Sequence, residues 1–155
     1  MKIGILECDE PLPQLRREFG TFSQMIAEPF ASVRSGWTFP VYNLLRNEFP
    51  QDLGDCDGYI TTGSRYSVYD ERPWIRELEI LTREADALEW PFVGICFGHQ
   101  MIANALGGRV ARSEKGWGVG VSVVDVQSAR ASSLGLASWP DPMRLVVSHQ
   151  DQVLD

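Results

Sequence analysis

The sequence predicts an α/β domain built on an open, mostly parallel β-sheet. The first observation is that short apolar runs alternate with longer amphipathic segments along the first hundred residues, as in strands joined by crossover helices. The second is that a helical pattern between residues 73 and 88 separates two strand-like runs. That order predicts a parallel pair of strands with a right-handed connection.

The region before residue 45 predicts two strands separated by a helical segment. Lys2 to Leu6 is short and apolar, as a central parallel strand is. Leu12 to Ala31 has apolar residues near helical spacing, and Gly20 and Pro29 are expected to break or end that helix. Thr38 to Tyr42 is predicted to be the second strand, although its proline weakens the pattern.

The central region predicts a strand, a helix and a further strand. Gly58 to Thr62 suits a strand because it contains aromatic and β-branched residues. A helix follows from Pro73, since proline is favoured in a first helical turn. Its apolar face is formed by Trp74, Leu78, Leu81, Ala85 and Leu88. Pro91 then opens an apolar run with the pattern of a buried strand.

The last third predicts further strands joined by loops. Gly108 to Ala111 and Val119 to Val126 have the composition of strands. The link between them, Lys115 to Gly120, is rich in glycine but lacks the spacing of a phosphate-binding loop, so we infer no nucleotide site. Gln127 to Pro142 is expected to be a loop anchored by Trp139.

Composition limits the class of protein. The 155 residues, 44% hydrophobic and 23% charged, suffice for one domain spanning residues 1–155. The net charge of −7 argues against a surface for nucleic acid or for an anionic membrane, because such surfaces need clustered Lys and Arg. Apolar runs are far shorter than the roughly 20 residues of a membrane span.

The termini and the cysteines favour the cytoplasm. Met1 to Gly4 leads directly into a strand, so we expect no signal peptide. Three cysteines do not make a disulfide framework, and we expect neither a metal site nor a cofactor. Cys8 follows the first strand and is interpreted as packing rather than as a second reactive thiol, while Cys56 has no evident role.

The run after Pro91 contains the most informative stretch of the chain. Cys96 stands between Gly94 and Gly98, and a helical pattern continues from there until Gly107. Small residues on both sides of a nucleophile permit the sharp turn of a strand–nucleophile–helix elbow. A thiol at a helix N-terminus is favoured as a thiolate. The alternative is a core cysteine beside a glycine-lined turn.

The same stretch carries a family resemblance. Gly94-Ile95-Cys96-Phe97-Gly98-His99-Gln100 resembles the nucleophile motif G-x-C-x-G-x-Q of class I glutamine amidotransferases, which include the glutaminase of GMP synthase and the γ-glutamyl peptidases. Two further segments fall where this family would place them, so the resemblance extends along the whole chain. It implies a flavodoxin-like fold with helices on both faces of the sheet, and Cys96 as the nucleophile.

The first of these further segments implies an oxyanion hole. Thr62-Gly63-Ser64 follows a predicted strand at the sheet edge where ligands bind in open α/β folds. By resemblance, the N–H groups of Gly63 and Phe97 stabilise the oxyanion, each worth roughly 3–4 kcal/mol. The family more often has Gly-Gly-Pro here, and the departure resembles its standalone γ-glutamyl-peptidase-like branch.

The second segment is Ser148-His149-Gln150-Asp151. Taken alone, the residues suggest a triad in which His149 is the base for Cys96 and Asp151 orients it. The resemblance instead implies that Ser148, His149 and Gln150, together with Gln100, bind the α-amino and α-carboxylate ends of the substrate.

A catalytic His-x-Glu motif of the family is absent from the sequence. Three explanations stay open. The chain is a fragment that lacks the C-terminal part of the domain, it is a degenerate member without activity, or His149 has become the base. Of these, we favour the fragment, because the sequence stops at Asp155 directly after a family motif.

The resemblance implies glutaminase chemistry. Cys96 attacks the side-chain amide of glutamine, a γ-glutamyl thioester forms, and ammonia is released for transfer, in some family members to a synthetase subunit. One alternative is a γ-glutamyl peptidase with the same chemistry on a peptide. Another is a catalytically silent module that binds glutamine or regulates a partner. The acceptor of the nitrogen and the oligomeric state stay open.

Overall fold

The strand-like runs of the first hundred residues form one parallel sheet, as predicted. The computed structural model describes residues 1–127, 132 and 140–155. Within them the sheet has the strand order β2-β1-β3-β4, and every pair in it is parallel. Its strands are β1 (Ile3–Glu7), β2 (Val41–Asn43), β3 (Gly58–Thr61) and β4 (Phe92–Gly94). The predicted anchor Trp139 lies outside the described residues.

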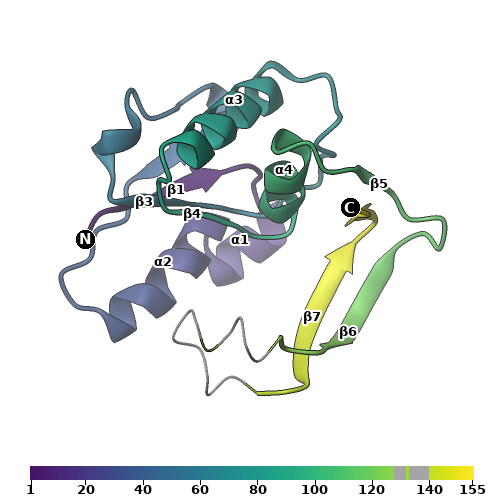
Figure 1. Ribbon diagram of the computed structural model, residues 1–155. Helices are drawn as coiled ribbons and strands as arrows, with labels where there is room; N and C mark the ends of the chain where they lie inside the picture. The colour runs from purple at the N-terminus through teal and green to yellow at the C-terminus, as the bar shows by residue number, and fades with distance from the viewer. Residues whose placement is uncertain (128–131, 133–139) are drawn as a thin grey trace. The chain divides into compact units, whose positions relative to one another are not determined.

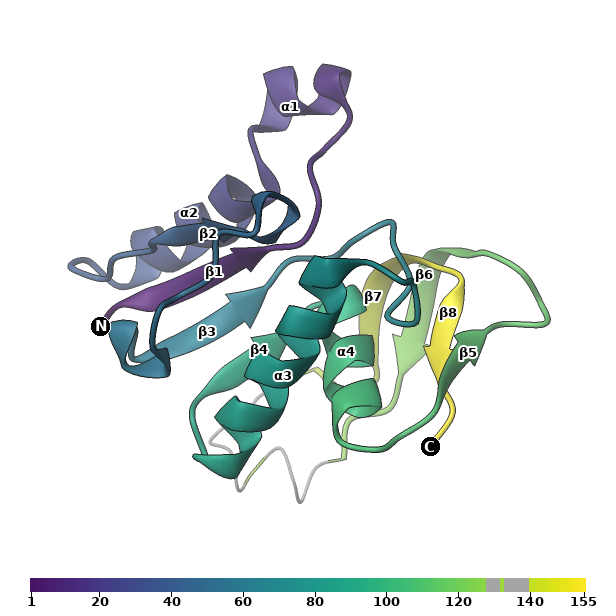
Figure 2. The ribbon, with the colours of Figure 1, turned by 90° about the horizontal axis from the view of Figure 1, so that it is seen from above.

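Helices lie on both faces of this sheet (Figures 1 and 2). On one face are α3 (Pro73–Ala87) and α4 (Phe97–Ala105). On the other is α2 (Phe22–Val33), which follows α1 (Pro13–Phe19). Short 3-10 turns, η1 (Leu44–Arg46) and η2 (Leu53–Asp55), lead from β2 to β3. The α/β architecture predicted from the alternation of patterns is therefore confirmed.

The first helical segment differs from the prediction at its proline. Gly20 separates α1 from α2 as expected, because it adopts φ 80, a left-handed value that glycine tolerates. Pro29, however, lies inside α2, and the helix continues to Val33. The capping box of Thr21 and Gln24 starts the helix firmly. Pro29 is on the exposed side, so its ring costs one helical hydrogen bond without disturbing the core.

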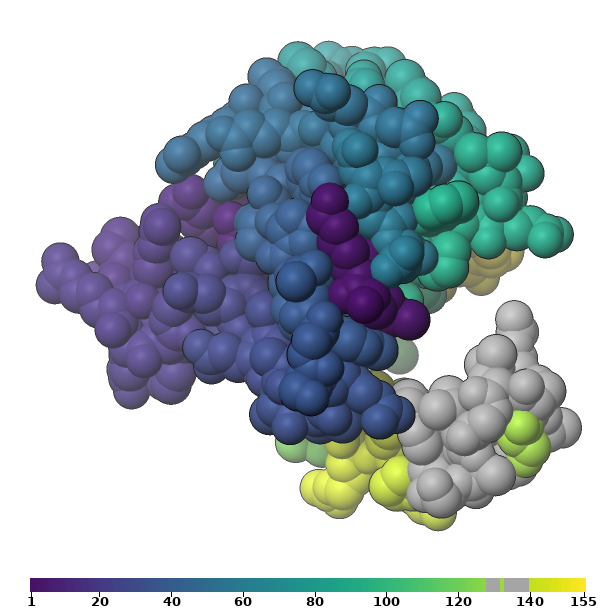
Figure 3. Space-filling view, turned by 90° about the vertical axis from the view of Figure 1, so that its left-hand side faces the viewer, coloured from purple at the N-terminus to yellow at the C-terminus, as the bar shows by residue number. Residues whose placement is uncertain are grey.

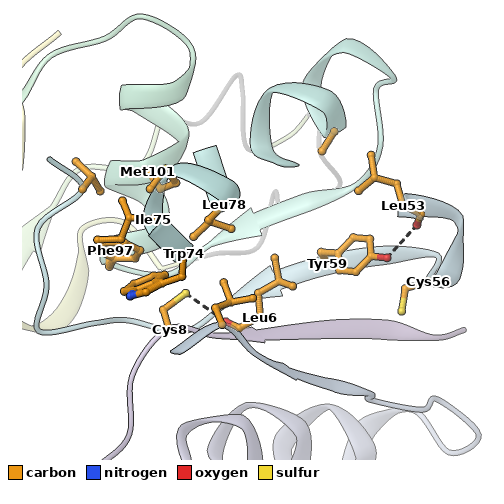
Figure 4. Packing of buried hydrophobic residues seen from close by; sticks show 13 residues of the cluster. Leu6, Cys8, Leu53, Cys56, Tyr59, Trp74, Ile75, Leu78, Phe97 and Met101 are labelled. Carbon is orange, nitrogen blue, oxygen red and sulfur yellow. Dashed lines mark hydrogen bonds between the residues drawn. The ribbon is translucent and has the colours of Figure 1, made fainter. Parts of the chain in front are cut away.

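The core lies between the sheet and the helices α3 and α4 (Figure 4). Leu6 of β1, Leu78 of α3 and Met101 of α4 are completely buried. Leu88, predicted on the buried face, is instead 59% exposed because α3 ends at Ala87. This packing fixes α4 against the sheet, and α4 begins directly after Cys96.

Strand β4 is more exposed than the buried strand that its apolar run predicts. Val93 in its middle is 56% exposed. In the part of the chain that the structure describes, β4 is the terminal strand of the sheet, next to β3 alone. A terminal strand has one neighbour less to cover it, whereas the apolar run alone resembles that of a central strand.

The start of the chain is tied to the strands beside it. Thr38 N–H donates to the carbonyl of Met1 (3.0 Å), and Asp57 N–H donates to the carbonyl of Lys2 (2.7 Å). In the space-filling view the first residues, dark purple, lie among the blue segments that follow in sequence (Figure 3). Strand β1 is thus central from its first residues onward.

By its contacts the chain divides into two compact units, Met1–Ala111 with Val153–Asp155, and Arg112–Gln152. The second unit contains an antiparallel pair, β6 (Gly118–Val124) and β7 (Met143–His149), in which Gly118 is opposite His149. The short strands β5 (Val110–Arg112) and β8 (Asp151–Val153) form another pair. Among the described residues, no helix combines the length and the apolar character needed to cross a membrane.

Candidate active site

Cys96 occupies a strained turn between β4 and α4. It has φ 52 and ψ −101, in a region that non-glycine residues rarely adopt. Cys96 is the N-cap of α4, and its carbonyl accepts the N–H of Gln100 (3.1 Å). Its side chain is exposed, whereas Phe97, the next residue, is completely buried. Strain of this kind is characteristic of functional sites, where surrounding packing holds the residue in place.

The two glycines around Cys96 are required by close approaches. A Cβ on Gly94 would lie 2.5 Å from both the carbonyl oxygen of Gly98 and the nitrogen of His99. A Cβ on Gly98 would overlap the side chain of Thr61 on β3. Real Cβ atoms do not approach other atoms so closely, so the elbow can form only with glycine at both positions.

The turn after β3 lies beside Cys96. A Cβ built on Gly63 would be 3.6 Å from the Cβ of Cys96. Thr61 of β3 pairs with Gly94 of β4, so the carboxyl ends of the two strands meet at one edge of the sheet. The first N–H groups of a helix have no partner within the helix, and Phe97 supplies the first one of α4. The arrangement therefore brings together Cys96 and the two residues predicted to form the oxyanion hole.

A network that the sequence analysis missed ties this turn to the end of β1. Asp9 is only 5% exposed, and its carboxylate accepts hydrogen bonds from the main-chain N–H of Arg65 (2.8 Å) and from the Arg65 Nε (2.9 and 3.0 Å). The Arg65 Nη2 donates to the carbonyl of Glu10 (2.7 Å). The local signal was a carboxylate two residues after a buried strand, but its partner is 56 residues away.

The other predicted substrate-binding residues fall in different parts of the chain. Gln100 is in α4, one turn after Cys96, and is 7% exposed. Ser148, His149 and Gln150 belong to the second unit, at the end of β7. Their roles toward a substrate, and the alternative pairing of Cys96 with His149, stay predictions.

His149 has a defined local partner. Its Nδ1 lies 3.0 Å from the main-chain carbonyl oxygen of Asp151. A carbonyl can only accept a hydrogen bond, so Nδ1 carries a proton, and a neutral ring then keeps its lone pair on Nε2. This contact involves the main chain of Asp151, whereas the simple triad would use the carboxylate of that residue.

The two remaining cysteines are buried. Cys8 is completely inaccessible, its thiol donates to the carbonyl of Leu6 (3.4 Å), and burial raises the pKa of this thiol far above its ordinary value. Cys56 lies 3.6 Å from the hydroxyl of Tyr42. These environments agree with the interpretation of Cys8 as a packing residue. In residues 1–127, 132 and 140–155, no three His, Cys, Asp or Glu side chains gather as metal ligands would.

A parallel α/β sheet with a strained cysteine between a strand and the start of a helix is the arrangement found in α/β proteins with a nucleophile elbow. Comparisons with known proteins identify the family of this chain. The class I glutamine amidotransferase family matches residues 18–154. The chain therefore belongs to this family, and the resemblance inferred from its motifs is confirmed.

Individual relatives agree with this assignment. γ-Glutamyl peptidase 2 of Arabidopsis thaliana is 25% identical over 143 residues, which are 91% of this chain and 57% of the peptidase. The glutamine-hydrolysing GMP synthase of Porphyromonas gingivalis is 39% identical over 64 residues, 41% of this chain and 12% of the synthase. The crystal structure of a Thermotoga maritima glutamine amidotransferase has the same fold, with a TM-score of 0.76 and 24% identity over 97% of this chain and 62% of that one. The chain thus spans less than two thirds of the length of these relatives.

Proposed function

We propose that this protein hydrolyses the side-chain amide of glutamine, or a γ-glutamyl amide like it, through a thioester on Cys96. The observation that carries the proposal is the position of Cys96, exposed in a strained turn at the start of α4, with Gly63 beside it. A buried packing cysteine needs neither exposure nor strain. A nucleophile needs both access to its substrate and a fixed direction of attack.

The proposed reaction has two steps. The Cys96 thiolate adds to the γ-carbonyl carbon, and the tetrahedral intermediate collapses with cleavage of the C–N bond, so that ammonia or an amine leaves after taking up a proton. Water then adds to the thioester, the C–S bond breaks, glutamate is released and the Cys96 thiol is regenerated. In both steps the negative oxygen would lie near the N–H groups of Gly63 and Phe97. Gln100, with the main chain of Ser148 to Gln150, would bind the α-amino and α-carboxylate groups.

The leaving nitrogen must be protonated, and two sources of the proton are proposed. One is a His-x-Glu pair, the motif that the family uses and the 155 residues lack. The other is His149, whose Nε2 is available if Nδ1 is held by the carbonyl of Asp151. The two proposals differ in whether the 155-residue chain alone is expected to hydrolyse its substrate.

The γ-glutamyl peptidase form of the function has specific support. The similarity to the Arabidopsis peptidase extends over 91% of this chain, and the similarity to GMP synthase over 41%. In the amidotransferase form, a synthetase subunit would consume the ammonia, and the likeness to GMP synthase supports that form. We place the activity in the reducing cytoplasm, where Cys8, Cys56 and Cys96, none of them in a disulfide, would stay reduced.

The test measures release of ammonia and glutamate from glutamine and from a γ-glutamyl dipeptide. The 155-residue chain, its Cys96→Ala variant and any longer native form are compared, with Cys56→Ala as the control for loss of a buried thiol. We expect turnover that Cys96→Ala abolishes and that Cys56→Ala retains.

Each outcome separates two proposals. Turnover by the 155-residue chain identifies His149 or another local group as the acid and base. Turnover by the longer form alone assigns that role to residues beyond Asp155. Release from the dipeptide but not from glutamine selects the peptidase. No release from either substrate by any form would overturn the enzymatic proposal in favour of a silent binding module.

A further inference from the structure

Two hydroxyl groups hold the turn of Gly63 from both sides. The Thr62 Oγ1 accepts the main-chain N–H of Cys8 (2.9 Å) and lies 2.9 Å from the carbonyl oxygen of Gly63. A hydroxyl has one proton, and the carbonyl can only accept, so Thr62 donates to Gly63. The hydrogen bonds therefore run in one direction, from Cys8 through Thr62 to Gly63.

Ser64 repeats this pattern on the other side of the glycine. Its Oγ accepts the N–H of Tyr66 (3.2 Å) and donates to the carbonyl of Cys8 (2.9 Å). The main-chain N–H and C=O of Cys8 thus each contact one neighbour of Gly63. Because Cys8 follows directly on β1, the turn is fixed to the centre of the sheet.

The remaining bonds prevent the turn from moving as a whole. The N–H of Thr62 donates to the carbonyl of Leu6 (3.0 Å), and the buried carboxylate of Asp9 holds the main-chain N–H of Arg65. Thr62 is 1% exposed, so water cannot replace the hydrogen bonds of its hydroxyl. Glycine has no side chain to orient its own N–H group. That N–H belongs to the Thr62–Gly63 peptide, which lies between the anchored N–H of Thr62 and the anchored carbonyl of Gly63, so its direction follows from the bonds on either side of it.

We propose that Thr62 and Ser64 are positioning residues that aim the N–H of Gly63 at the oxyanion formed on the substrate. This inference rests on the proposed function, because it needs attack by Cys96 on a carbonyl. The Cβ position of Gly63, 3.6 Å from that of Cys96, is the geometric link between the braced turn and the reacting atoms. An oxyanion donor stabilises a transition state only when it is held in place before the charge develops.

The test compares two reactions of Cys96 in the form of the protein that hydrolyses the dipeptide, either the 155-residue chain or a longer native form. Hydrolysis of a γ-glutamyl dipeptide passes through an oxyanion. Alkylation by iodoacetamide displaces iodide from a saturated carbon and does not. Thr62→Val removes the hydroxyl at nearly constant volume, and Thr62→Ser retains it. The matched control is Thr82→Val, because Thr82 is also buried and its Oγ1 donates to the carbonyl of Leu78 (2.7 Å) in α3.

We expect Thr62→Val to lower kcat by about 10- to 100-fold, somewhat less than removal of a donor, with KM and the alkylation rate within about twofold of wild type. Thr62→Ser should keep most of kcat, and Thr82→Val should alter stability alone. If Thr62→Val does not fold, Ser64→Ala makes the same comparison at a half-buried position.

Three results would overturn the inference. An undiminished kcat in Thr62→Val, or in Ser64→Ala where that variant is used, removes the positioning role. Equal losses of hydrolysis and alkylation mean that the hydroxyls act on Cys96 or on the fold. A wild-type protein that is alkylated at Cys96 but hydrolyses neither glutamine nor the dipeptide overturns the proposed function, and the inference fails with it.

Discussion

Gly98 of α4 lies so close to Thr61 of β3 that any side chain at position 98 would overlap the Thr61 hydroxyl. That hydroxyl also accepts the N–H of Ile95 (3.3 Å), the residue before Cys96. Thr61 is completely buried and cannot turn away into solvent. The contact of these two residues therefore sets how closely α4 approaches the sheet, and with it the position of Cys96.

We expect Gly98→Ala to destabilise the protein by about 1–3 kcal/mol, the usual cost of overpacking. We also expect slower alkylation of Cys96, because the added methyl group would push α4 away from Thr61 and displace the turn that holds Cys96. Urea unfolding and the rate of reaction with iodoacetamide measure the two effects. Gly118→Ala is the control, since its added Cβ meets only the carbonyl oxygen of His149 at 3.6 Å. Equal stabilities of the two variants would contradict the close approach.

Gly63→Ala should separate activity from stability. The added Cβ would be at an ordinary contact distance of 3.6 Å from the Cβ of Cys96, so the free energy of unfolding should change by less than about 1 kcal/mol. The methyl group would nevertheless occupy space next to the nucleophile. We expect kcat for a γ-glutamyl dipeptide to fall by about 100-fold. A Gly63→Ala variant with full activity would exclude a role of the Gly63 turn in the reaction.

The elbow could be predicted from the sequence because Gly94, Cys96 and Gly98 are neighbours in it. Their spacing carries the information directly, and the structure adds the reason for each glycine. The bonds that fix Gly63 could not be predicted in the same way. Thr62 and its partner Cys8 are 54 residues apart, and a local pattern does not contain such a pairing.

Two further differences between prediction and structure have separate causes. The apolar run of β4 gave no sign that this strand would have β3 as its single neighbour among the described strands, because strand order depends on contacts between distant segments. Pro29 was expected to break or end a helix, but the capping box at Thr21 and the exposed position of the proline ring let α2 continue with one hydrogen bond missing.

Replacing Pro29 by Ala should stabilise the protein. Alanine restores the N–H that proline lacks and removes its clash with the preceding turn, so we expect a gain of about 1–3 kcal/mol in the free energy of unfolding. Pro73→Ala is the matched control, because Pro73 is in the first turn of α3, where no helical partner is lost. Chemical denaturation of both variants tests this. A gain in Pro73→Ala equal to that in Pro29→Ala would refute the explanation.

Above pH 9 the protein should lose stability through Cys8. Burial raises the pKa of this thiol in the folded protein above its ordinary value of 9.0. The unfolded chain therefore releases the proton first, and the stabilisation present below pH 9.0 is lost as the pH rises, by at most about 1.4 kcal/mol per pH unit. Urea unfolding of Cys8→Ala should show a shallower loss, while Cys96→Ala, at an exposed position, should follow wild type. Identical slopes in Cys8→Ala and wild type would assign the loss to other groups.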